Sequence, residues 1–209
     1  MTEATMPEPP ADDAIFGGQL PALRDALAQL LASIESIRHE LRETRGEDPV
    51  EHCLGRIKTA GSLREKCLRK GVEPTAEAAF RHIADIVGVR VVCAFLDDVY
   101  LVRDRIAALP GMVIEEETDY IRHVKPNGYR SYHMVVSLDG GPRAEVQLRT
   151  ISMDTWAALE HQIKYKRDLK GDLELITSEL KRCADELAST DLSMQTIRNM
   201  ISAGEEAQQ

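Results

Sequence analysis

The chain has 209 residues, of which 43% are hydrophobic and 29% charged, with a formal net charge of −9. This length can bury one substantial core, and the acidic balance excludes a protein coated with positive charge for nonspecific nucleic-acid binding. The longest apolar runs fall far below the roughly 18 residues of a membrane span, and no signal peptide opens the chain. The four cysteines are scattered without a CxxC pair, so we expect a soluble protein of the reducing cytoplasm.

The predicted elements begin with a leader and a long helix. Residues 1–18 are rich in proline, acidic and small side chains, which is typical of a disordered leader. From residue 19 the pattern becomes helical, with leucine and isoleucine recurring at steps of three and four up to Leu41. Glycine is a favoured helix terminator, and Gly46 therefore predicts the end of an N-terminal helix within residues 19–48.

Shorter helices are predicted next. Asp48-Pro49 favours the start of a short helix, because proline suits the first helical turn. Ser62-Leu-Arg-Glu65 forms a capping box, which predicts a helix that begins at Ser62 and runs to about Lys70. Pro74 opens a further helical turn or two.

The rest of the chain contains both strands and helices. Its β-branched or alternating segments predict four strands, over residues 87–95, 112–118, 132–138 and 143–149. Helical periodicity predicts four helices, over residues 97–109, 152–166, 172–188 and 191–203. This order predicts an α+β (mixed α/β) fold, with a central mixed β-sheet of about five strands flanked by helices.

Positive charge is concentrated in two windows of this acidic chain. Residues 56–70 contain six Lys or Arg against a single Glu, and residues 122–130 contain three against none. A solvated helix face is the usual interpretation of any one surface Lys or Arg. Two basic windows, each with Gly or Ser beside the charges, instead favour phosphate binding.

The first basic window can form an anion site at the start of a helix. If Ser62 caps the helix, the first turn presents free N–H groups and the positive end of the helix dipole. Lys66 follows one turn later and Arg69 or Lys70 about one turn after that, along one face. Arg56 and Lys58 alternate in the preceding segment and point the same way if that segment is extended. For Ser62 taken alone, a simple helix cap is the favoured interpretation.

The second basic window contains the run Lys125-Pro-Asn127-Gly-Tyr129-Arg-Ser-Tyr-His133. Its Asn-Gly pair predicts a turn that presents Tyr129 between basic side chains, which suits a stacked base with phosphates nearby. The alternative is a hairpin tyrosine that covers a small local core. His133 is compatible with a phosphate donor or with a half-buried strand histidine.

Two carboxylates lie near predicted strands. Asp85 precedes the strand at residue 87, and Glu145 shares one face of its strand with Gln147 and Arg149. Carboxylates from neighbouring strands can hold a Mg²⁺ that bridges phosphate oxygens, and Glu145 can accept a proton from an attacking hydroxyl. A lone strand glutamate is usually only solvated, so this site depends on the basic windows. The helix around Trp156 is interpreted as mainly structural.

Together these motifs resemble those of one known family. Between Val50 and Lys166 the chain contains, in order, RxKxxxSxxxKxxR, DxxGxR, KxNGYRSxH, EVQLRT and WAxLEH. The set resembles the synthetase domain of RelA/SpoT-type guanosine polyphosphate (alarmone) enzymes. The resemblance implies transfer of pyrophosphate from ATP to the 3′-hydroxyl of GDP or GTP, with release of AMP. It also implies a nucleotidyltransferase-like synthetase fold, with residues 49–170 as the catalytic domain and residues 171–209 as C-terminal oligomerisation helices.

The resemblance implies roles for single residues as well. Arg56 and Arg90 would sandwich the adenine. The phosphates of ATP would be held by Lys58, Ser62, Lys66 and Arg69. Asp85 and Glu145 would bind Mg²⁺, Glu145 would also activate the 3′-hydroxyl, and Lys66 would complete the catalytic set. The GDP or GTP site would consist of Lys125, Asn127, Tyr129, His133 and Gln147, with Tyr129 stacked on guanine.

The resemblance further implies a stand-alone small alarmone synthetase. The chain lacks the His-Asp dipeptide of the family's hydrolase domain, so no hydrolase activity is expected. Such synthetases are similar in forming homotetramers through terminal helices, and the apolar stripes of the first and last helices are compatible with one. Nucleic-acid binding is not expected, and single-stranded RNA is the one nucleic acid left open. The alternatives are a catalytically inactive nucleotide- or RNA-binding regulator and a nucleotidyltransferase that releases pyrophosphate.

Overall fold

Five strands form one mixed sheet in the computed structural model, which describes residues 14–165 and 173–206. Their order across the sheet is β1-β2-β5-β4-β3. β2 and β5 are parallel and the other neighbouring pairs are antiparallel, so the predicted mixed sheet is confirmed. The strands are β1 (Val50–Ile57), β2 (Val87–Cys93), β3 (Met112–Asp119), β4 (Tyr132–Leu138) and β5 (Ala144–Thr150).

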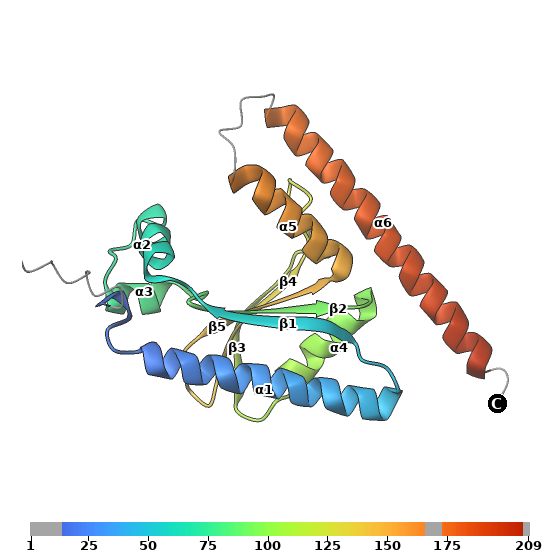
Figure 1. Cartoon of the computed structure of the whole chain (residues 1–209), viewed down its shortest axis with the longest axis horizontal. Helices are drawn as coiled ribbons and strands as arrows, with labels where there is room; N and C mark the ends of the chain where they lie inside the picture. Colours follow the sequence, from blue (N-terminus) through green and yellow to red (C-terminus); the bar gives the residue numbers. More distant parts are fainter. Residues whose placement is uncertain (1–13, 166–172, 207–209) are drawn as a thin grey trace, which may run out of the picture.

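Helices lie on both faces of the sheet and beyond one of its ends (Figure 1). One face is packed by α1 and α4, and α5 lies on the other face with α6 beside it. None of the described helices combines the length and the apolar character that crossing a membrane requires. The helices are the 3₁₀ turn η1 (Ala14–Phe16), α1 (Leu20–Arg45), α2 (Ala60–Arg69), α3 (Ala76–His82), α4 (Leu96–Ala107), α5 (Ile151–Tyr165) and α6 (Leu173–Glu206).

The main core lies between the sheet and the two helices that cover one of its faces, α1 and α4. α1 buries the apolar stripe that its periodicity predicted, at Leu23, Leu30, Ile34, Ile37 and Leu41. A Cβ on Gly55 would lie only 2.7 Å from Leu27 Cδ1, so glycine in β1 allows α1 to pack closely. Burial of each such Leu or Ile contributes about 1.5–3 kcal/mol. The apolar stripe of α1 is therefore buried against other parts of the same chain.

The segment after α1 is a strand, where Asp48-Pro49 predicted a short helix. The Asp48 side chain accepts a hydrogen bond from the Val50 N–H at 3.0 Å, which satisfies that N–H as the strand begins. β1 then pairs with β2 along its length, from Val50 opposite Cys93 to Ile57 opposite Val87. Sheet pairing over the whole segment outweighs the local helical preference of proline, so the helix prediction is wrong.

α2 begins earlier than its capping box predicted. Thr59 is the N-cap, because its Oγ1 accepts a hydrogen bond from the Ser62 N–H at 3.3 Å. The Thr59 hydroxyl also donates to Ser62 Oγ at 3.0 Å. The predicted cap at Ser62 is therefore wrong, since another capping residue lies three positions before it. Ser62 instead lies in the first turn of the helix.

Two further expectations differ at the ends of the chain. Of the predicted leader, residues 1–13 lie outside the described residues, but residues 14–16 form η1, where Ile15 and Phe16 are buried in the core. α6 is one helix where two were predicted. At the predicted break, Thr190 donates its hydroxyl to the Glu186 carbonyl and Asp191 accepts from Thr150, so both polar side chains are satisfied without ending the helix.

Candidate active site

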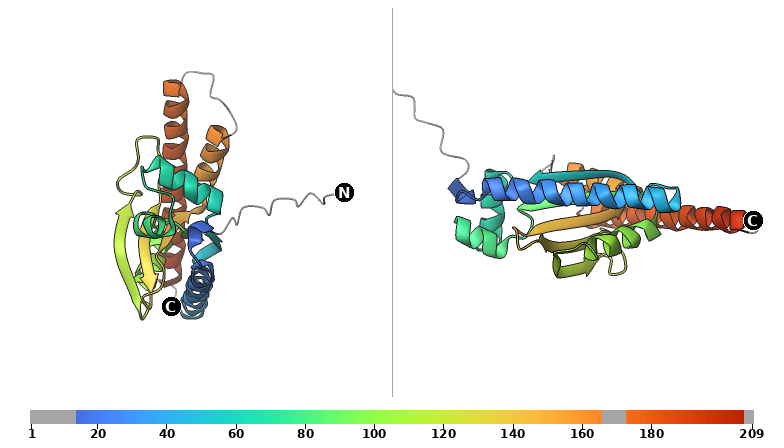
Figure 2. Two further views of the ribbon diagram at one scale, coloured as in Figure 1. Left: turned by 90° about the vertical axis from the view of Figure 1, so that its left-hand side faces the viewer. Right: turned by 90° about the horizontal axis from the view of Figure 1, so that it is seen from below.

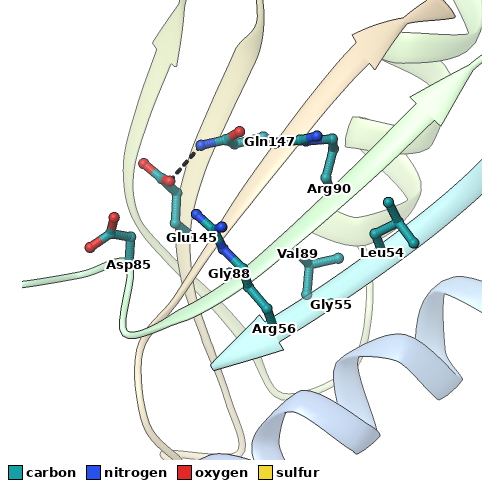
Figure 3. A pocket seen from close by; sticks show the side chains of 9 residues that line it. All are labelled: Leu54, Gly55, Arg56, Asp85, Gly88, Val89, Arg90, Glu145 and Gln147. Carbon is teal, nitrogen blue, oxygen red and sulfur yellow. Dashed lines mark hydrogen bonds between the residues drawn. The ribbon is translucent and has the colours of Figure 1, made fainter. Parts of the chain in front are cut away.

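Strand register places the predicted site residues in two adjacent rows on one face of the sheet. The first row contains Arg56 opposite Gly88, which in turn lies opposite Glu145. The second row contains Arg90 opposite Gln147, which lies opposite His133. Alternation directs these side chains away from the core face formed by the buried valines of β2 and β5. Figure 3 shows Arg56 and Arg90 on neighbouring strands with Glu145 and Gln147 beside them.

Asp85 lies in the turn before β2, where two lysines hold it. Its Oδ2 is 3.1 Å from Lys58 Nζ and 2.6 Å from Lys66 Nζ. Burial alone would raise the pKa of Asp85, but hydrogen bonds and charge attraction from Lys66 and Lys58 outweigh it, and the pKa is lowered. Its Oδ1 is buried, and no described residue gives it a hydrogen bond. Asp85 is therefore an ionised carboxylate with one buried oxygen still available to a ligand.

Glu145 accepts two hydrogen bonds from polar side chains of the same face. Gln147 Nε2 donates to Glu145 Oε2 at 2.7 Å, and His133 Nδ1 lies 3.3 Å from Glu145 Oε1. Burial would raise the pKa of Glu145, as does the charge of Asp85, but His133 and Gln147 outweigh these effects and lower it. Glu145 is therefore ionised near neutral pH.

Two cavities meet at these carboxylates. The first, of about 220 Å³, is lined by residues of β1, β2 and β5 that include Leu54, Arg56, Gly88, Arg90 and Gln147 (Figure 3). The second, of about 270 Å³, is polar and is lined by residues that include Lys66, Lys70, His82, Tyr120, His133 and Arg143. Of the described residues, Asp85 and Glu145 are those that line both cavities. The paired carboxylates thus lie where the contents of two cavities would meet.

Arg90 lines the first cavity and is half-buried. Burial and the nearby charge of Arg149 lower the pKa of Arg90, although Asp154 acts in the opposite direction. Its Nη1 lies 3.2 Å from Asp154 Oδ1. A Cβ on Gly88 would meet no heavy atom within 4 Å, so the missing side chain leaves space between Arg56 and Glu145. A flat group can enter this space and lie against the guanidinium planes.

The loop before β4 is a turn, as the Asn-Gly pair predicted. Gly128 N–H donates to the Lys125 carbonyl at 2.8 Å, and Tyr129 N–H donates to Asn127 Oδ1 at 3.2 Å. Asn127 also donates to Glu160 Oε1 of α5 at 3.3 Å, so its side chain shapes the loop. Lys125, Asn127 and Tyr129 lie beside the second cavity and are not among its described lining residues.

α6 contacts both the loop before β4 and helix α5. Arg130 Nη2 lies 2.7 Å from Asp185 Oδ1, and the Trp156 indole donates to the Leu180 carbonyl at 2.9 Å. Trp156 is 5% exposed, which agrees with its predicted structural role. Leu159, on α5 with Trp156, is exposed.

The remaining predicted residues lie on α2. Ser62 and Arg69 are exposed on this helix and are not among the described residues that line the two cavities. Lys66, between them in the chain, reaches Asp85. Of the residues that the sequence predicted on one basic face of this helix, Lys66 is therefore the one that reaches Asp85, whereas Ser62 and Arg69 line neither cavity among the described residues.

Three residues near the site had no predicted role. Arg149 is 4% exposed and donates to Tyr129 and Gln147. Asp154, on α5, lies within 3.2 Å of both Arg90 and Arg149. Tyr120 lines the second cavity and packs edge-on against Tyr129 and His133. The scarcity of aromatic residues was a signal for Tyr120, whereas the Arg149–Asp154 contact depends on the packing of α5 and has no sequence signature.

Comparison with known proteins identifies the family. Residues 55–170, more than half of the chain, match the family described as a region found in RelA / SpoT proteins. The chain belongs to the RelA/SpoT family. Among its RelA/SpoT relatives, GTP pyrophosphokinase YwaC of Bacillus subtilis is 37% identical over 184 residues, covering 84% of this chain and 87% of the relative.

Solved structures of RelA/SpoT relatives share the fold. The small alarmone synthetase 1 from Bacillus subtilis bound to its product pppGpp gives a TM-score of 0.77 at 30% identity, covering 87% of this chain and 95% of that chain. The structure of the same synthetase bound to AMPCPP gives 0.71 at 27% identity, covering 88% and 96%. The resemblance and the α+β fold class predicted from the sequence are both confirmed.

Proposed function

We propose that this RelA/SpoT chain is a GTP pyrophosphokinase, which transfers pyrophosphate from ATP to the 3′-hydroxyl of GDP or GTP and releases AMP. The observation that carries the proposal is the pair of cavities that share Asp85 and Glu145. A transfer between two nucleotides requires two binding spaces that meet at the reacting atoms. The names of the relatives, a GTP pyrophosphokinase and a synthetase bound to pppGpp or AMPCPP, support the same reaction.

The first cavity is the proposed ATP site. Arg56 and Arg90 are diagonal neighbours across β1 and β2, and the gap left by Gly88 admits an adenine between or against them. Exposed Leu54 adds apolar surface for the base. The ATP phosphates would then run past the carboxylates toward the basic side chains of α2 and the segment before it: Lys58, Ser62, Lys66 and Arg69.

Asp85 and Glu145 fit a Mg²⁺ ion between the substrates. Mg²⁺ in phosphoryl-transfer sites is held by one or two carboxylates together with substrate phosphates and water. The described residues offer no group of three or more His, Cys, Asp or Glu that could hold a metal alone. The buried Asp85 Oδ1 is an acceptor that such an ion would satisfy. Bound there, Mg²⁺ would neutralise charge on the transferred phosphates.

Glu145 is the proposed base for the acceptor hydroxyl. It is held ionised by His133 and Gln147, and it lines both cavities, so a 3′-hydroxyl entering from the second cavity would meet it. Tyr129 is proposed to stack on guanine, with Lys125, Asn127, His133 and Gln147 completing the acceptor side. Lys125 Nζ lies 4.1 Å from the Tyr120 ring centroid and 4.9 Å from that of Tyr129, which keeps positive charge beside the aromatic rings.

We also propose that residues 49–170 form the catalytic unit and residues 171–209 an oligomerisation helix in a homotetramer. α6 exposes apolar side chains toward its end, and Figure 2 shows this end projecting past the sheet. They are Leu192, Met194, Ile197, Met200 and Ile201. The α1 stripe is buried within the chain, so α6 is the stronger contact surface. A cytoplasmic location is proposed because all four cysteines are free thiols.

The decisive experiment identifies both products. The protein is incubated with ATP, Mg²⁺ and each of GMP, GDP and GTP, and the nucleotides are separated by anion-exchange chromatography. We expect AMP together with a guanine nucleotide that carries two additional phosphates. Release of pyrophosphate would indicate a nucleotidyltransferase instead, and no product with any acceptor would refute the proposal.

Glu145→Gln tests whether Glu145, which lines both cavities, is the base for the acceptor hydroxyl. We expect a loss of turnover of at least about 100-fold, because an amide cannot accept the hydroxyl proton, while ATP binding is retained. Glu77→Gln is the matched control, since Glu77 is exposed on α3 and is not among the described residues that line either cavity. This control should keep its turnover within a few-fold of the unmodified protein.

A further inference from the structure

The site face contains a closed ring of five hydrogen-bonded side chains. Arg149 Nη2 donates to the Tyr129 hydroxyl at 2.7 Å and to Gln147 Oε1 at 2.9 Å. The Tyr129 hydroxyl lies 2.8 Å from His133 Nε2. His133 and Gln147 both form hydrogen bonds with Glu145, one with each carboxylate oxygen. Two arms therefore run from Arg149 to Glu145, one through Tyr129 and His133 and the other through Gln147.

Arg149 sets the direction of both arms. A guanidinium can only donate, so the Tyr129 oxygen accepts from Arg149. The ionised Glu145 can only accept, so a neutral His133 leaves its Nε2 as the acceptor for the Tyr129 hydroxyl. His133 then carries its proton on Nδ1 and donates it to Glu145. In the other arm, donation from Arg149 requires the oxygen of the Gln147 amide, which directs the Gln147 nitrogen to Glu145. Both oxygens of Glu145 thus receive a hydrogen bond on this side.

The ring is anchored to the first cavity through Asp154. Asp154 Oδ1 lies 3.0 Å from Arg149 Nη1 and 3.2 Å from Arg90 Nη1. Arg149 is buried, so its position is fixed by these contacts rather than by solvent. One carboxylate oxygen therefore joins the arginine proposed to contact adenine to the arginine that holds Tyr129.

We propose that Arg149, held by Asp154, is a positioning residue that orients Tyr129 and Gln147 for the acceptor nucleotide and for Glu145. This inference rests on the proposed function, because it takes Tyr129 as the guanine contact and Glu145 as the base. Arg149 does not line either cavity among the described residues, so it acts through its neighbours. Its guanidinium donates to Ser131 Oγ as well as to the three partners already named, Tyr129, Gln147 and Asp154. A single ammonium group does not reproduce these four contacts in the same geometry.

Arg149→Lys is the first test, because it keeps the charge beside Asp154. We expect turnover to fall about 10- to 100-fold, as for a misplacement of reacting groups, and the affinity for GDP to fall about tenfold, within the range of one lost base stack. The KM for ATP should change little, since Arg90 keeps Asp154. Arg103→Lys is the matched control: Arg103 forks onto Glu117 at 2.7 and 2.6 Å, away from the ring. It should leave turnover and GDP affinity within about twofold.

GDP binding can be followed without turnover. The chain has a single tryptophan, and its ring centroid lies 6.4 Å from that of Tyr129, so Trp156 fluorescence reports on this loop. Titration with GDP alone gives the dissociation constant for each variant. Circular dichroism melts of the same samples identify any variant that is simply unfolded.

A double-mutant cycle separates positioning from general destabilisation. Tyr129→Phe keeps the ring and removes the hydroxyl that Arg149 holds. If Arg149 acts through that hydroxyl, the double variant binds GDP no more weakly than the weaker single variant. Fold-losses that multiply, or an Arg149→Lys protein that binds GDP and turns over like the unmodified one, would overturn the positioning role.

The same samples distinguish this inference from the proposed reaction. An unmodified protein that binds GDP but forms no AMP would refute the reaction, and the binding cycle would still decide the role of Arg149. An unmodified protein that binds no guanine nucleotide would overturn both the proposed reaction and the positioning role of Arg149. Tyr129 would then have no nucleotide to contact.

Discussion

Gly128, in the turn before β4, is the point where the acceptor loop touches α6. Its φ is +92°, a conformation that side chains rarely adopt. A Cβ added there would lie 2.7 Å from Ala184 Cβ and 3.1 Å from Lys181 Cα. Because Lys181 Cα is backbone, the clash can be relieved only if the loop and α6 move apart. Gly128→Ala therefore tests whether α6 fixes the loop that carries Tyr129.

The expected cost has two parts, and Gly140→Ala separates them. Gly140 also has a positive φ, +71°, but a Cβ there meets nothing within 4 Å, so its substitution costs the backbone strain of about 1 kcal/mol. Gly128→Ala adds overpacking, which typically costs about 1–3 kcal/mol. We expect a total near 3 kcal/mol. For a chain of this size, 1 kcal/mol lowers the melting temperature by about 2–4 °C, which gives roughly 6–12 °C for Gly128→Ala and 2–4 °C for the control.

Thermal melts and GDP titrations of both variants provide the assay. Gly128→Ala should lower the melting temperature more than Gly140→Ala and should also weaken GDP binding, because Tyr129 is its neighbour in the chain. Gly140→Ala should leave GDP binding unchanged, since its turn joins β4 to β5 at the far end of the strands from Tyr129. Equal losses of stability in the two variants would refute the close contact with α6.

Three further predictions concern the two cavities and the start of the sheet. Gly88→Val should raise the KM for ATP more than about tenfold by filling the first cavity, with stability unchanged or higher because valine favours strands; unchanged ATP kinetics would place ATP elsewhere. Tyr129→Ala should weaken the acceptor by about 1–3 kcal/mol, seen as a KM raised about 5- to 150-fold. Burial would raise the pKa of Asp48, but hydrogen bonds from Arg38 and Arg42 outweigh it and lower the pKa to about 2. This stabilisation is therefore present above pH 4 and lost as the pH falls to 2, and Asp48→Asn should cost about 1–2 kcal/mol at pH 7 but little at pH 2 in denaturation experiments, after allowance for partial exposure.

Local sequence patterns predicted the parts of the fold whose signals agree with one another. The strand at residues 132–138 was predicted with the bounds that β4 has, and α1 buries the stripe that its periodicity indicated. Alternation along β5 also placed Glu145 and Gln147 on one face. In these segments the local preference and the tertiary contacts favour the same structure.

The wrong predictions occurred where a distant contact decides the local structure. β1 is a strand because β2 lies beside it, although Asp48-Pro49 is a common helix start. α6 continues through residue 191 because Thr150, from another element, satisfies Asp191. Arg149 and Asp154 are only five residues apart, but they belong to different elements, so their contact, for which no role was predicted, depends on how α5 packs over β5. A single sequence carries no local signal for such pairs.

The lysine contacts of Asp85 explain how a chain of net charge −9 can receive two polyanions. Lys58 and Lys66 already face the site, where Asp85 holds their ammonium groups close together. With ATP bound, Lys58 and Lys66 would be able to pair with phosphate oxygens, and Asp85 would be one of the carboxylates able to hold Mg²⁺. Each charge would keep an opposite charge throughout, so binding would avoid the cost of leaving a buried charge unpaired. Asp85 would thus have two uses, as a metal ligand with substrate and as a holder of the lysines before substrate binds. Asp85→Asn should therefore slow turnover and, in titrations without Mg²⁺, tighten ATP binding, because the two lysines lose a competing carboxylate. Loss of a metal ligand alone would leave metal-free ATP binding unchanged.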